Sequence, residues 1–452
     1  MGEDHPTENP RLAIVGAGLG GALLATYLGK AGYSVDVYER RADPRAGNVD
    51  RGRSINLAIS ARGIHALEEL GLAERVMCMA IPMRGRMIHS TSGELSFQPY
   101  DKDPAKCINS ISRADLNRAL IEAADQYAEV RFHFARKCTD VDLNQPAVVL
   151  DGPAARELGQ HPPGRIVQNC DIVLAVDGLY SAVRAAMQRL DRFDYQQTYL
   201  AHGYKELSIP PATDGTFALE PNALHIWPRR SFMMIALPNQ DKSFTCTLFL
   251  AFEGTDSFNV LRSDDDVRHF FQDHFPDAAP LMPTLVEDFR RNPTGSLGTI
   301  RCGPWHYRDK VLLLGDAAHA IVPFYGQGMN CAFEDCTILN DCIEQYAPDW
   351  GRTFAVFYEK RKHHTDAIAD LALHNFVEMR DRTGSARFRL NKTAERVMHR
   401  LVPGYLPLYS MVSFSRIPYA CAVQRDRNQR RASKAIVILL LAAAVTLLGY
   451  LI

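Results

Sequence analysis

The sequence predicts a mixed α/β fold of two domains, in which a Rossmann-like domain is interrupted by a β-rich domain. Three observations support this fold class: a strand, glycine turn, helix and second strand near the N-terminus, two later glycine–acid turns that follow apolar strands, and a β-rich stretch between those turns. A helical C-terminal region and a terminal transmembrane helix complete the expected architecture.

The first unit occupies residues 11–41, "RLAIVGAGLGGALLATYLGKAGYSVDVYERR". A short apolar run predicts a buried parallel strand, and Gly16, Gly18 and Gly21 then form G-x-G-x-x-G at the start of a helical pattern. Such glycines let backbone N–H groups approach a pyrophosphate, and Glu39 at the end of the next strand can accept hydrogen bonds from a ribose. The unit predicts a dinucleotide site; the alternative is a glycine-rich turn in an ordinary α/β domain.

Two further turns carry an acid after an apolar strand. Residues 172–176 predict a buried strand that ends at Asp177–Gly178, with Ser181 as the N-cap of the next helix. In "VLLLGDAAHAIVPFYGQGMN", residues 311–330, Asp316 follows a similar strand and a helix is expected to begin within "GQGMN". An acid can accept hydrogen bonds from hydroxyl groups of a long ligand, and a helix N-terminus favours negative charge. We expect this strand to return to the first domain.

The β-rich stretch, residues 204–250, contains turns at "EPNA", "PRRS" and "PNQDKS". Its segments "ALHIWP", "FMMIALP" and "FTCTLFL" are predicted to be adjacent antiparallel strands, and residues 349–425 are expected to be mostly helical. The predicted limits are residues 10–83, 105–186 and 297–345 for the discontinuous nucleotide-binding domain, 84–104 and 187–296 for the β-rich domain, 346–425 for the helical region and 435–452 for the transmembrane helix.

Composition excludes several classes of function. The net charge of -1 gives no general attraction to nucleic acid, and no basic stripe with aromatic residues is present. Ten scattered cysteines without a C-x-x-C pair indicate reduced thiols, and no cluster of metal ligands is expected. The polar, acidic start "MGEDHPTENP" predicts no signal peptide. The oligomeric state does not follow from the sequence.

The C-terminal stretch, residues 435–452, has 18 residues without a charge. As a helix it would be about 27 Å long, against a hydrocarbon core of about 30 Å. The preceding basic residues are Arg425, Arg427, Arg430, Arg431 and Lys434. This pattern predicts a membrane anchor that contacts anionic lipid and leaves the rest of the chain on the cytoplasmic side. The membrane would be the mitochondrial outer membrane of a eukaryote or the inner membrane of a bacterium; a buried core helix is the alternative.

The order and spacing of the three motifs resemble those of the single-component, FAD-dependent aromatic hydroxylases. The stretches "RGRSINLAIS", "LEPNALHIWPRRSFMMIALPN", "VPFYGQGMNCAFEDC" and "HNFVEMRD" are similar to the kynurenine 3-monooxygenase family in particular. The resemblance extends from about residue 11 to residue 419, and the hydrophobic tail resembles the membrane anchor of the eukaryotic members.

The resemblance implies bound FAD, with NADPH as co-substrate and O2 as oxidant, although the motifs alone leave NADH or NADPH open. It implies hydroxylation of L-kynurenine to 3-hydroxykynurenine through a flavin C4a-hydroperoxide, a step of tryptophan catabolism. The flavin performs this chemistry, so no catalytic side chain is expected and His319 is interpreted as structural. The residues expected to bind FAD are Gly16, Gly18, Gly21, Glu39, Arg40, Ala58, Arg113, Asp177, Asp316, Gly328, Met329 and Asn330.

The resemblance also assigns a substrate site. Arg86 and Tyr100 match contacts to the carboxylate of the substrate, with Asn375 and Tyr409 approaching from the helical region. The expected wall around the aniline ring consists of Leu224, Ile235, Leu237, Thr247 and Phe249, and the residues expected to face the flavin are Pro323, Phe324 and Gln327. A fork-shaped guanidinium suits a carboxylate because it binds both oxygens. The residues alone are equally consistent with Arg86 as a surface arginine.

Two other functions stay open from the sequence. One is a flavin hydroxylase that acts on a phenol, whose pocket would not need Arg86 or Tyr100 for a carboxylate. The other is a membrane-tethered flavoprotein that binds partners and does not hydroxylate. Tyr325, just before "GQG", leaves the polarity of the substrate pocket open but not the reaction that the resemblance implies.

Overall fold

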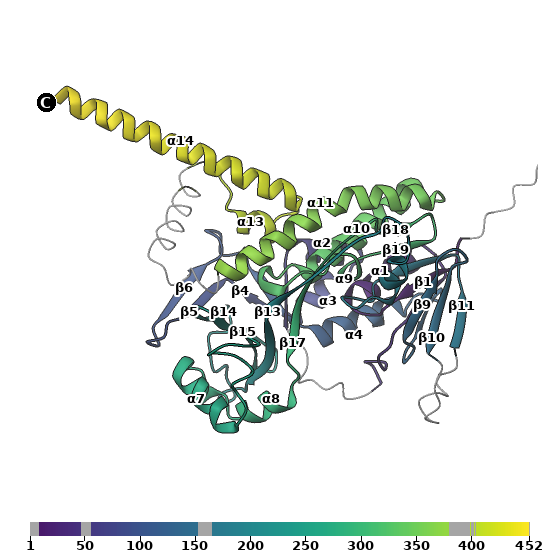
Figure 1. Cartoon of the computed structure of the whole chain (residues 1–452), viewed down its shortest axis with the longest axis horizontal. Helices are drawn as coiled ribbons and strands as arrows, with labels where there is room; N and C mark the ends of the chain where they lie inside the picture. The colour runs from purple at the N-terminus through teal and green to yellow at the C-terminus, as the bar shows by residue number, and fades with distance from the viewer. Residues whose placement is uncertain are drawn as a thin grey trace, which may run out of the picture.

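The computed structural model describes residues 9–46, 56–151, 165–378, 398, 402 and 404–451, without the side chains of residue 165 and residues 436–451. Figure 1 shows two β-sheet regions side by side, with helices packed over them and one long helix that projects from the body.

A six-stranded sheet forms the centre of the nucleotide-binding region, in the order β18-β19-β12-β1-β2-β8. Its strands are β1 (Leu12–Val15), β2 (Val35–Tyr38), β8 (Val130–His133), β12 (Ile172–Ala175), β18 (His306–Tyr307) and β19 (Val311–Leu313). β12 and β19 pair in parallel, and β12 also pairs in parallel with β1. The expected return of the third piece to the first domain is therefore confirmed.

Helices α1 (Leu19–Lys30), α4 (Arg113–Ala124) and α10 (Gly328–Tyr346) pack beside this sheet, with α1 in contact with both of the others. The four residues of β1 are all buried, as expected for a central parallel strand of apolar residues. Shorter elements surround them: α2 (Ala61–Glu69), α3 (Ala73–Met77), α6 (Ala182–Met187) and α9 (Asp316–His319). These elements place all three predicted turns in one region.

Two small antiparallel sheets border this region. One has the order β3-β7-β4, from β3 (Asn56–Ile59), β4 (Ile81–Met83) and β7 (Ile108–Ser112). The other has the order β11-β10-β9, from β9 (Cys138–Asp142), β10 (Ala147–Asp151) and β11 (Arg165–Asn169).

The second region is a seven-stranded sheet in the order β17-β13-β16-β15-β14-β5-β6. Its strands are β5 (Gly85–His89), β6 (Leu95–Pro99), β13 (Asp194–Ile209), β14 (Ala223–Arg229), β15 (Phe232–Pro238), β16 (Phe244–Ala251) and β17 (Gly295–Gly303). The predicted antiparallel pairing of β14, β15 and β16 is confirmed. The parallel pairing of β5 with β14 joins stretches far apart in the sequence. The exact domain limits stay a prediction.

The two faces of this sheet have different neighbours. Directly paired residues lie on the same face, and successive residues alternate. Trp227, Met234 and Leu248 lie on one face, in a core completed by α7 (Asp264–His274) and α8 (Leu285–Arg291). The short helix η2 (Ala279–Leu281) lies between α7 and α8 in the chain. Figure 1 shows α7 and α8 at the lower edge of the molecule, on the side away from α11. The opposite face is left for the predicted substrate site.

The described part of the C-terminal region is largely helical, with α11 (Trp350–Val377), α13 (Leu408–Ser413) and α14 (Tyr419–Leu451). A short helix, η3 (Pro323–Tyr325), packs against α11. Helix α14 leaves the body as a single long helix (Figure 1). Across the described residues, no helix has both the length and the hydropathy needed to cross a membrane. Since the side chains of residues 436–452 lie outside the described part, the predicted anchor stays a prediction.

Candidate functional site

The three glycines of the turn after β1 have different surroundings: two are closely packed and one faces open space. A Cβ atom on Gly21 would lie 1.9 Å from the Gly16 carbonyl oxygen, and a Cβ on Gly16 would lie 2.6 Å from the Val176 carbonyl oxygen. Gly16 also has φ +102°, which side-chain-bearing residues rarely adopt. A Cβ on Gly18, by contrast, meets nothing within 4 Å. The fold requires Gly16 and Gly21, whereas Gly18 leaves room at the N-terminus of α1 for a phosphate.

Glu39 holds this turn in place. Its Oε2 accepts a hydrogen bond from the Ala17 N–H at 2.9 Å, and its Oε1 accepts one from the Arg41 N–H at 2.9 Å. The Asn117 side chain donates to the Ala17 carbonyl oxygen at 2.9 Å from the neighbouring helix α4. Glu39 therefore lies beside the glycine turn as the motif predicts, while Arg40 is exposed at the rim.

Asp177 retains one free oxygen in the second turn. Its Oδ2 accepts hydrogen bonds from the Ala182 N–H at 2.7 Å and the Val183 N–H at 3.4 Å. Its Oδ1 is buried and has no partner among the described residues. Burial raises the pKa of Asp177, and the hydrogen bonds from its neighbours oppose the shift. Ser181 caps α6 as predicted, since its hydroxyl accepts from the Arg184 N–H at 2.9 Å.

The third turn brings Asp316 and the start of α10 to the same region. Asp316 keeps accessible surface, yet the surrounding protein desolvates its carboxyl and raises its pKa, while the Arg113 guanidinium opposes that shift. The buried Asn330 accepts from the Ser60 N–H at 2.9 Å and donates to the Ala58 and Gly326 carbonyl oxygens, both at 2.8 Å. Asn330 thus fixes β3 against the first turn of α10. Gly328 and Met329 lie in that same turn.

The expectation that the chain has no cluster of potential metal ligands is wrong, because one lies buried behind this turn. His319, Cys331 and Asp335 lie within 4.8 Å of one another, a grouping that could hold a metal ion, whereas no such grouping was predicted. However, Asp335 already accepts from His319 at 2.6 Å, from Arg361 at 2.7 Å and from the Gly315 N–H at 3.0 Å. The Arg361 guanidinium also lies 3.3 Å from the Cys331 sulfur, where its charge would repel a cation. Ion pairing of His319 and Arg361 with Asp335 accounts for the cluster.

Arg62 extends this ion-pair network to the C-terminal region. Its Nε donates to Glu334 Oε1 at 2.9 Å, and its two Nη atoms donate to the carbonyl oxygens of Val412 and Ile417. The guanidinium lies 3.9 Å from the centre of the Tyr419 ring. Glu334 Oε2 in turn accepts from Arg361 at 2.5 Å. Sequence reasoning did not find this network, although two adjacent acids, Glu334 and Asp335, lie on the part of α10 that proves to be buried.

The predicted carboxylate-binding residues meet at the end of β5. The Arg86 guanidinium lies 5.0 Å from the Tyr409 ring centre and 5.7 Å from that of Tyr100. The Tyr100 and Tyr409 rings stack at 5.0 Å, and Tyr325 stacks on Tyr409 at 5.6 Å. Burial lowers the pKa of Arg86, but the surrounding phenols and Glu378 raise it above its ordinary value. Arg86 Nε and the Tyr100 hydroxyl are buried and form no hydrogen bond of good geometry with the described residues, although the Tyr100 hydroxyl lies close enough to Arg86 and Tyr409 to interact with both electrostatically.

The strand register gathers the predicted apolar wall on one sheet face. Leu224 pairs with Arg86, Ile235 pairs with Thr247, and the alternation of β14, β15 and β16 adds the remaining two members. The wall consists of Leu224, Ile235, Leu237, Thr247 and Phe249, on the same face as Arg86. The Thr247 hydroxyl is buried and has no partner among the described residues. An apolar wall with a guanidinium at its edge, whose Nε has no partner among the described residues, suits a ring that carries a carboxylate side chain.

The residues expected to face the flavin lie between this wall and α10. Phe324 contacts Phe249 with ring centres 4.8 Å apart, and the Asn375 side chain donates to the Phe324 carbonyl oxygen at 2.5 Å. Gln327 is buried, donates to the Ser60 hydroxyl at 3.3 Å and accepts from the Tyr419 hydroxyl at 3.0 Å. Pro323, by contrast, is exposed at the start of η3. Asn375 therefore lies near the predicted site, with one donor directed at the η3 backbone.

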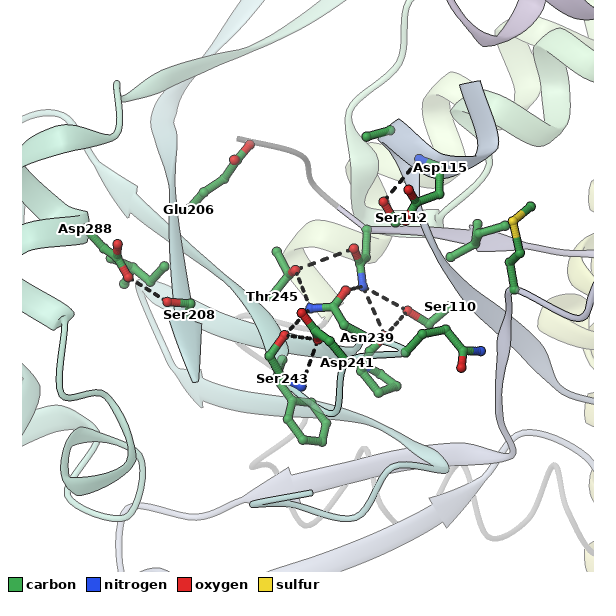
Figure 2. A pocket seen from close by; sticks show the side chains of 18 of the residues that line it. Ser110, Ser112, Asp115, Glu206, Ser208, Asn239, Asp241, Ser243, Thr245 and Asp288 are labelled. Atoms are coloured by element: carbon green, nitrogen blue, oxygen red, sulfur yellow. Dashed lines mark hydrogen bonds between the residues drawn. The ribbon is translucent and has the colours of Figure 1, made fainter. Parts of the chain in front are cut away.

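A separate cavity of about 420 Å³ lies beside this site (Figure 2). It is enclosed by β7 and the first turn of α4 on one side and by β13, β16 and the end of α8 on the other. None of the residues predicted for the cofactor or substrate lines it.

Comparison with known proteins agrees with these features. The family described as FAD binding domain matches residues 10–345. The fold is similar to that of 2-methyl-3-hydroxypyridine-5-carboxylic acid oxygenase, with a TM-score of 0.66 and 18% identity over 89% of this chain and 95% of that chain. It is also similar to p-nitrophenol 4-monooxygenase PnpA from Pseudomonas putida DLL-E4, with a TM-score of 0.67 and 18% identity over 85% and 93% of the two chains. The chain thus contains an FAD binding domain and has the fold of the flavoprotein monooxygenases.

Closer relatives narrow this class. The chain is 50% identical to the kynurenine 3-monooxygenase of Myxococcus xanthus over 91% of this chain and 88% of the relative. It is 44% identical to that of Dictyostelium discoideum over 92% and 90%, and 44% identical to that of Sus scrofa over 93% and 87%. The chain belongs to the kynurenine 3-monooxygenase family.

Proposed function

We propose that the protein hydroxylates L-kynurenine to 3-hydroxykynurenine with NADPH and O2 while FAD is bound. One observation carries this proposal: buried, unpartnered polar atoms of Arg86 and Tyr100 lie at the edge of an apolar wall. Kynurenine offers the matching groups, since its amino-acid carboxylate can accept from Arg86 and Tyr100 while its aniline ring packs on the wall. A phenol without a carboxylate would leave the Arg86 donor unpaired in a buried position, at a cost of about 1–3 kcal/mol.

The residues of the three turns fit FAD. The open space at Gly18 suits the pyrophosphate, and the free Asp177 Oδ1 and the accessible Asp316 suit hydroxyl groups. Bound FAD would supply the redox chemistry, from hydride acceptance to oxygen transfer. The protein would bind the substrate carboxylate at Arg86, orient the ring against Leu224 and Ile235, and exclude water there. The aniline nitrogen already activates the ring, so no protein base is required.

The direct test combines cofactor release with a turnover assay. Purified protein should be yellow and release FAD on denaturation, and kynurenine should stimulate NADPH consumption with formation of 3-hydroxykynurenine. A phenol that lacks a carboxylate, such as 4-methylphenol, serves as the control and should give no hydroxylated product. Hydroxylation of the phenol but not of kynurenine would establish the other aromatic hydroxylase function. A flavoprotein that hydroxylates neither would support a binding role instead.

Gly18 provides a clean test of the FAD site. A Cβ atom at this position meets no neighbouring atom within 4 Å, so Gly18→Val should fold normally yet lose flavin, because the side chain occupies the space for the pyrophosphate. Circular dichroism checks folding, and flavin absorbance checks binding. Flavin content equal to that of the wild type would place the pyrophosphate elsewhere.

We also propose that residues 435–452 anchor the protein in a membrane. The 18 uncharged residues and the basic residues before them support this proposal. Deletion of residues 435–452 should move the protein from the membrane to the soluble fraction while it retains FAD. Full-length protein that is soluble without detergent would contradict the anchor.

A further inference from the structure

The hydride donor needs a place of its own beside the flavin. The sequence contains one G-x-G-x-x-G unit followed by a strand and an acid, and its turn fits FAD. We propose that the cavity in Figure 2 binds the nicotinamide and ribose of the reduced dinucleotide donor, an inference that rests on the proposed function.

The cavity begins directly beside the substrate wall. Glu206 on β13 pairs with Thr247, which is a member of that wall, so the two side chains lie on the same face of the sheet. Ser208 pairs with Thr245 two residues further along, and both line the cavity together with Glu206. The cavity and the wall are therefore neighbouring parts of one sheet face.

The other side of the cavity borders the predicted flavin contacts. Ser112 and Ala114 line it, and they flank Arg113 in the chain. Asn56 also lines it and lies on β3, two residues before Ala58. Figure 2 shows Glu206 and Asp115 on opposite sides of the pocket, with Asn239 and Thr245 between them. The cavity is therefore lined by neighbours of predicted flavin contacts on one side and by neighbours of the substrate wall on the other.

The lining chemistry suits a carboxamide and a ribose. Ligand pockets range from about 300 to 1,000 Å³, and this one has about 420 Å³. Its side chains include a hydrogen-bonded group of amides and hydroxyls: Asn56 donates to Asn239 at 2.6 Å and to Ser110 at 3.2 Å, and Asn239 donates to Thr245 at 3.1 Å. Such groups can exchange these bonds for bonds to amide and hydroxyl groups of a ligand.

The charges of the lining residues favour the nicotinamide and ribose over the phosphates of the donor inside the cavity. The acids are Asp115, Glu206, Asp241 and Asp288, and the basic residues are Arg118 and Arg291. Asp288 already accepts from Arg291 at 2.9 Å and from Ser208 at 2.6 Å. An excess of carboxylates disfavours phosphates inside the cavity, so the phosphates of the donor would lie outside it.

Glu206 would assist the hydride step electrostatically. In that step the C4–H bond of the dihydronicotinamide breaks, the hydride forms a new N–H bond at flavin N5, and the neutral donor ring becomes a pyridinium cation. A carboxylate held beside the ring stabilises the cation more than the neutral reactant. No described residue donates a hydrogen bond to the Glu206 carboxylate, and Arg113 is close enough to oppose the pKa rise that burial causes.

Anaerobic stopped-flow reduction of the flavin at pH 8, with saturating kynurenine and varied NADPH, tests the proposal. Glu206→Gln should lower the limiting reduction rate about tenfold while the affinity for kynurenine stays unchanged. Gln240→Trp, which adds bulk at the cavity rim, should raise the apparent Kd for NADPH at least tenfold. Asp194→Asn is the matched control because it lies on the same strand outside the cavity and is exposed, so it should change neither value.

A binding measurement separates this inference from the enzymatic reaction. Saturation-transfer NMR with NADP⁺ should show nicotinamide protons in contact with the wild-type protein and weaker contact in Gln240→Trp. Unchanged reduction kinetics and unchanged nicotinamide contacts in both variants, in an enzyme that still hydroxylates kynurenine, would overturn the cavity assignment. A wild-type protein that hydroxylates no kynurenine would contradict the proposed function instead.

Discussion

Two arginines, the buried Arg62 and the half-buried Arg86, show how a structural region differs from a binding region in this molecule. All three nitrogen atoms of the Arg62 guanidinium donate hydrogen bonds within the protein, to Glu334, Val412 and Ile417. Arg86 keeps its Nε buried without a partner among the described residues, with tyrosine rings around its guanidinium. The protein provides acceptors for all three nitrogens of the Arg62 guanidinium, whereas Arg86 Nε has no acceptor among the described residues.

The same contrast extends beyond the two arginines. Within the described residues, eight buried side-chain atoms have no hydrogen-bond partner, and four of them belong to residues that the sequence assigned to the ligand sites. Those four residues are Arg86, Tyr100, Asp177 and Thr247. An unpaired buried polar group costs about 1–3 kcal/mol. The cost is most easily tolerated where a ligand provides the missing partner, so such atoms are better guides to function here than burial alone.

The largest effect is expected at Arg62. Arg62→Met should lower the free energy of unfolding by about 3–5 kcal/mol, because it leaves two buried carbonyl oxygens without donors and removes half of the charge that balances Glu334. Urea unfolding of the two proteins measures the difference. Arg268→Met is the control, since the exposed pair of Arg268 with Asp265 should contribute at most about 1 kcal/mol. Equal losses of unfolding free energy in both variants would show that the buried contacts of Arg62 contribute no more to stability than an exposed ion pair.

Arg86 should give a smaller effect of a different kind. Arg86→Ala should weaken kynurenine binding by about 1.5–3 kcal/mol, seen as a higher KM, because the substrate loses a charge-assisted hydrogen bond. Stability and FAD content should stay near those of the wild type, since Arg86 Nε has no protein partner to lose. Arg84→Ala, two residues earlier and exposed, is the matched control. An unchanged KM in Arg86→Ala would contradict the carboxylate assignment.

The sequence predicted the parts of the fold that depend on local patterns. The apolar run before Gly16, the cap at Ser181 and the alternating strands from β14 to β16 all follow from spacing within a few residues. The parallel pairing of Arg86 with Leu224 joins segments 138 residues apart, so no local pattern reveals it. The family resemblance, not the pattern, named Arg86 for the site.

The Arg62 network shows the opposite limit. Arg62 stands in a short amphipathic helix, where an arginine is normally exposed. Its partners at Val412 and Ile417 are backbone carbonyls, which carry no sequence signal at all. The adjacent acids Glu334 and Asp335 need cationic partners because they are buried in α10, but their burial is itself seen only in the structure. Such networks depend on tertiary packing and are found only in the structure.

The smallest effect per measured step concerns the pH dependence of stability that arises from the buried ion pairs of Asp335 with His319 and Arg361. Burial alone would lower the pKa of His319, but Asp335 raises it to about 10. A histidine with a raised folded-state pKa contributes stability that is fully present below its unfolded value of about 6.5 and is lost as pH rises toward the folded value. Each pH unit in that range removes up to about 1.4 kcal/mol.

His319→Gln should therefore change the slope of stability against pH. From pH 6.5 to 7.5 the wild type should lose up to about 1.4 kcal/mol that the variant does not lose, because glutamine does not titrate. Urea midpoints at pH 6, 7, 8 and 9 measure both slopes. At low pH the sign reverses for the partner: Asp335 has a lowered pKa, so its contribution is lost as pH falls below the ordinary carboxyl range. Equal slopes of stability against pH for the two proteins above pH 6.5 would show that His319 is not charged beside Asp335.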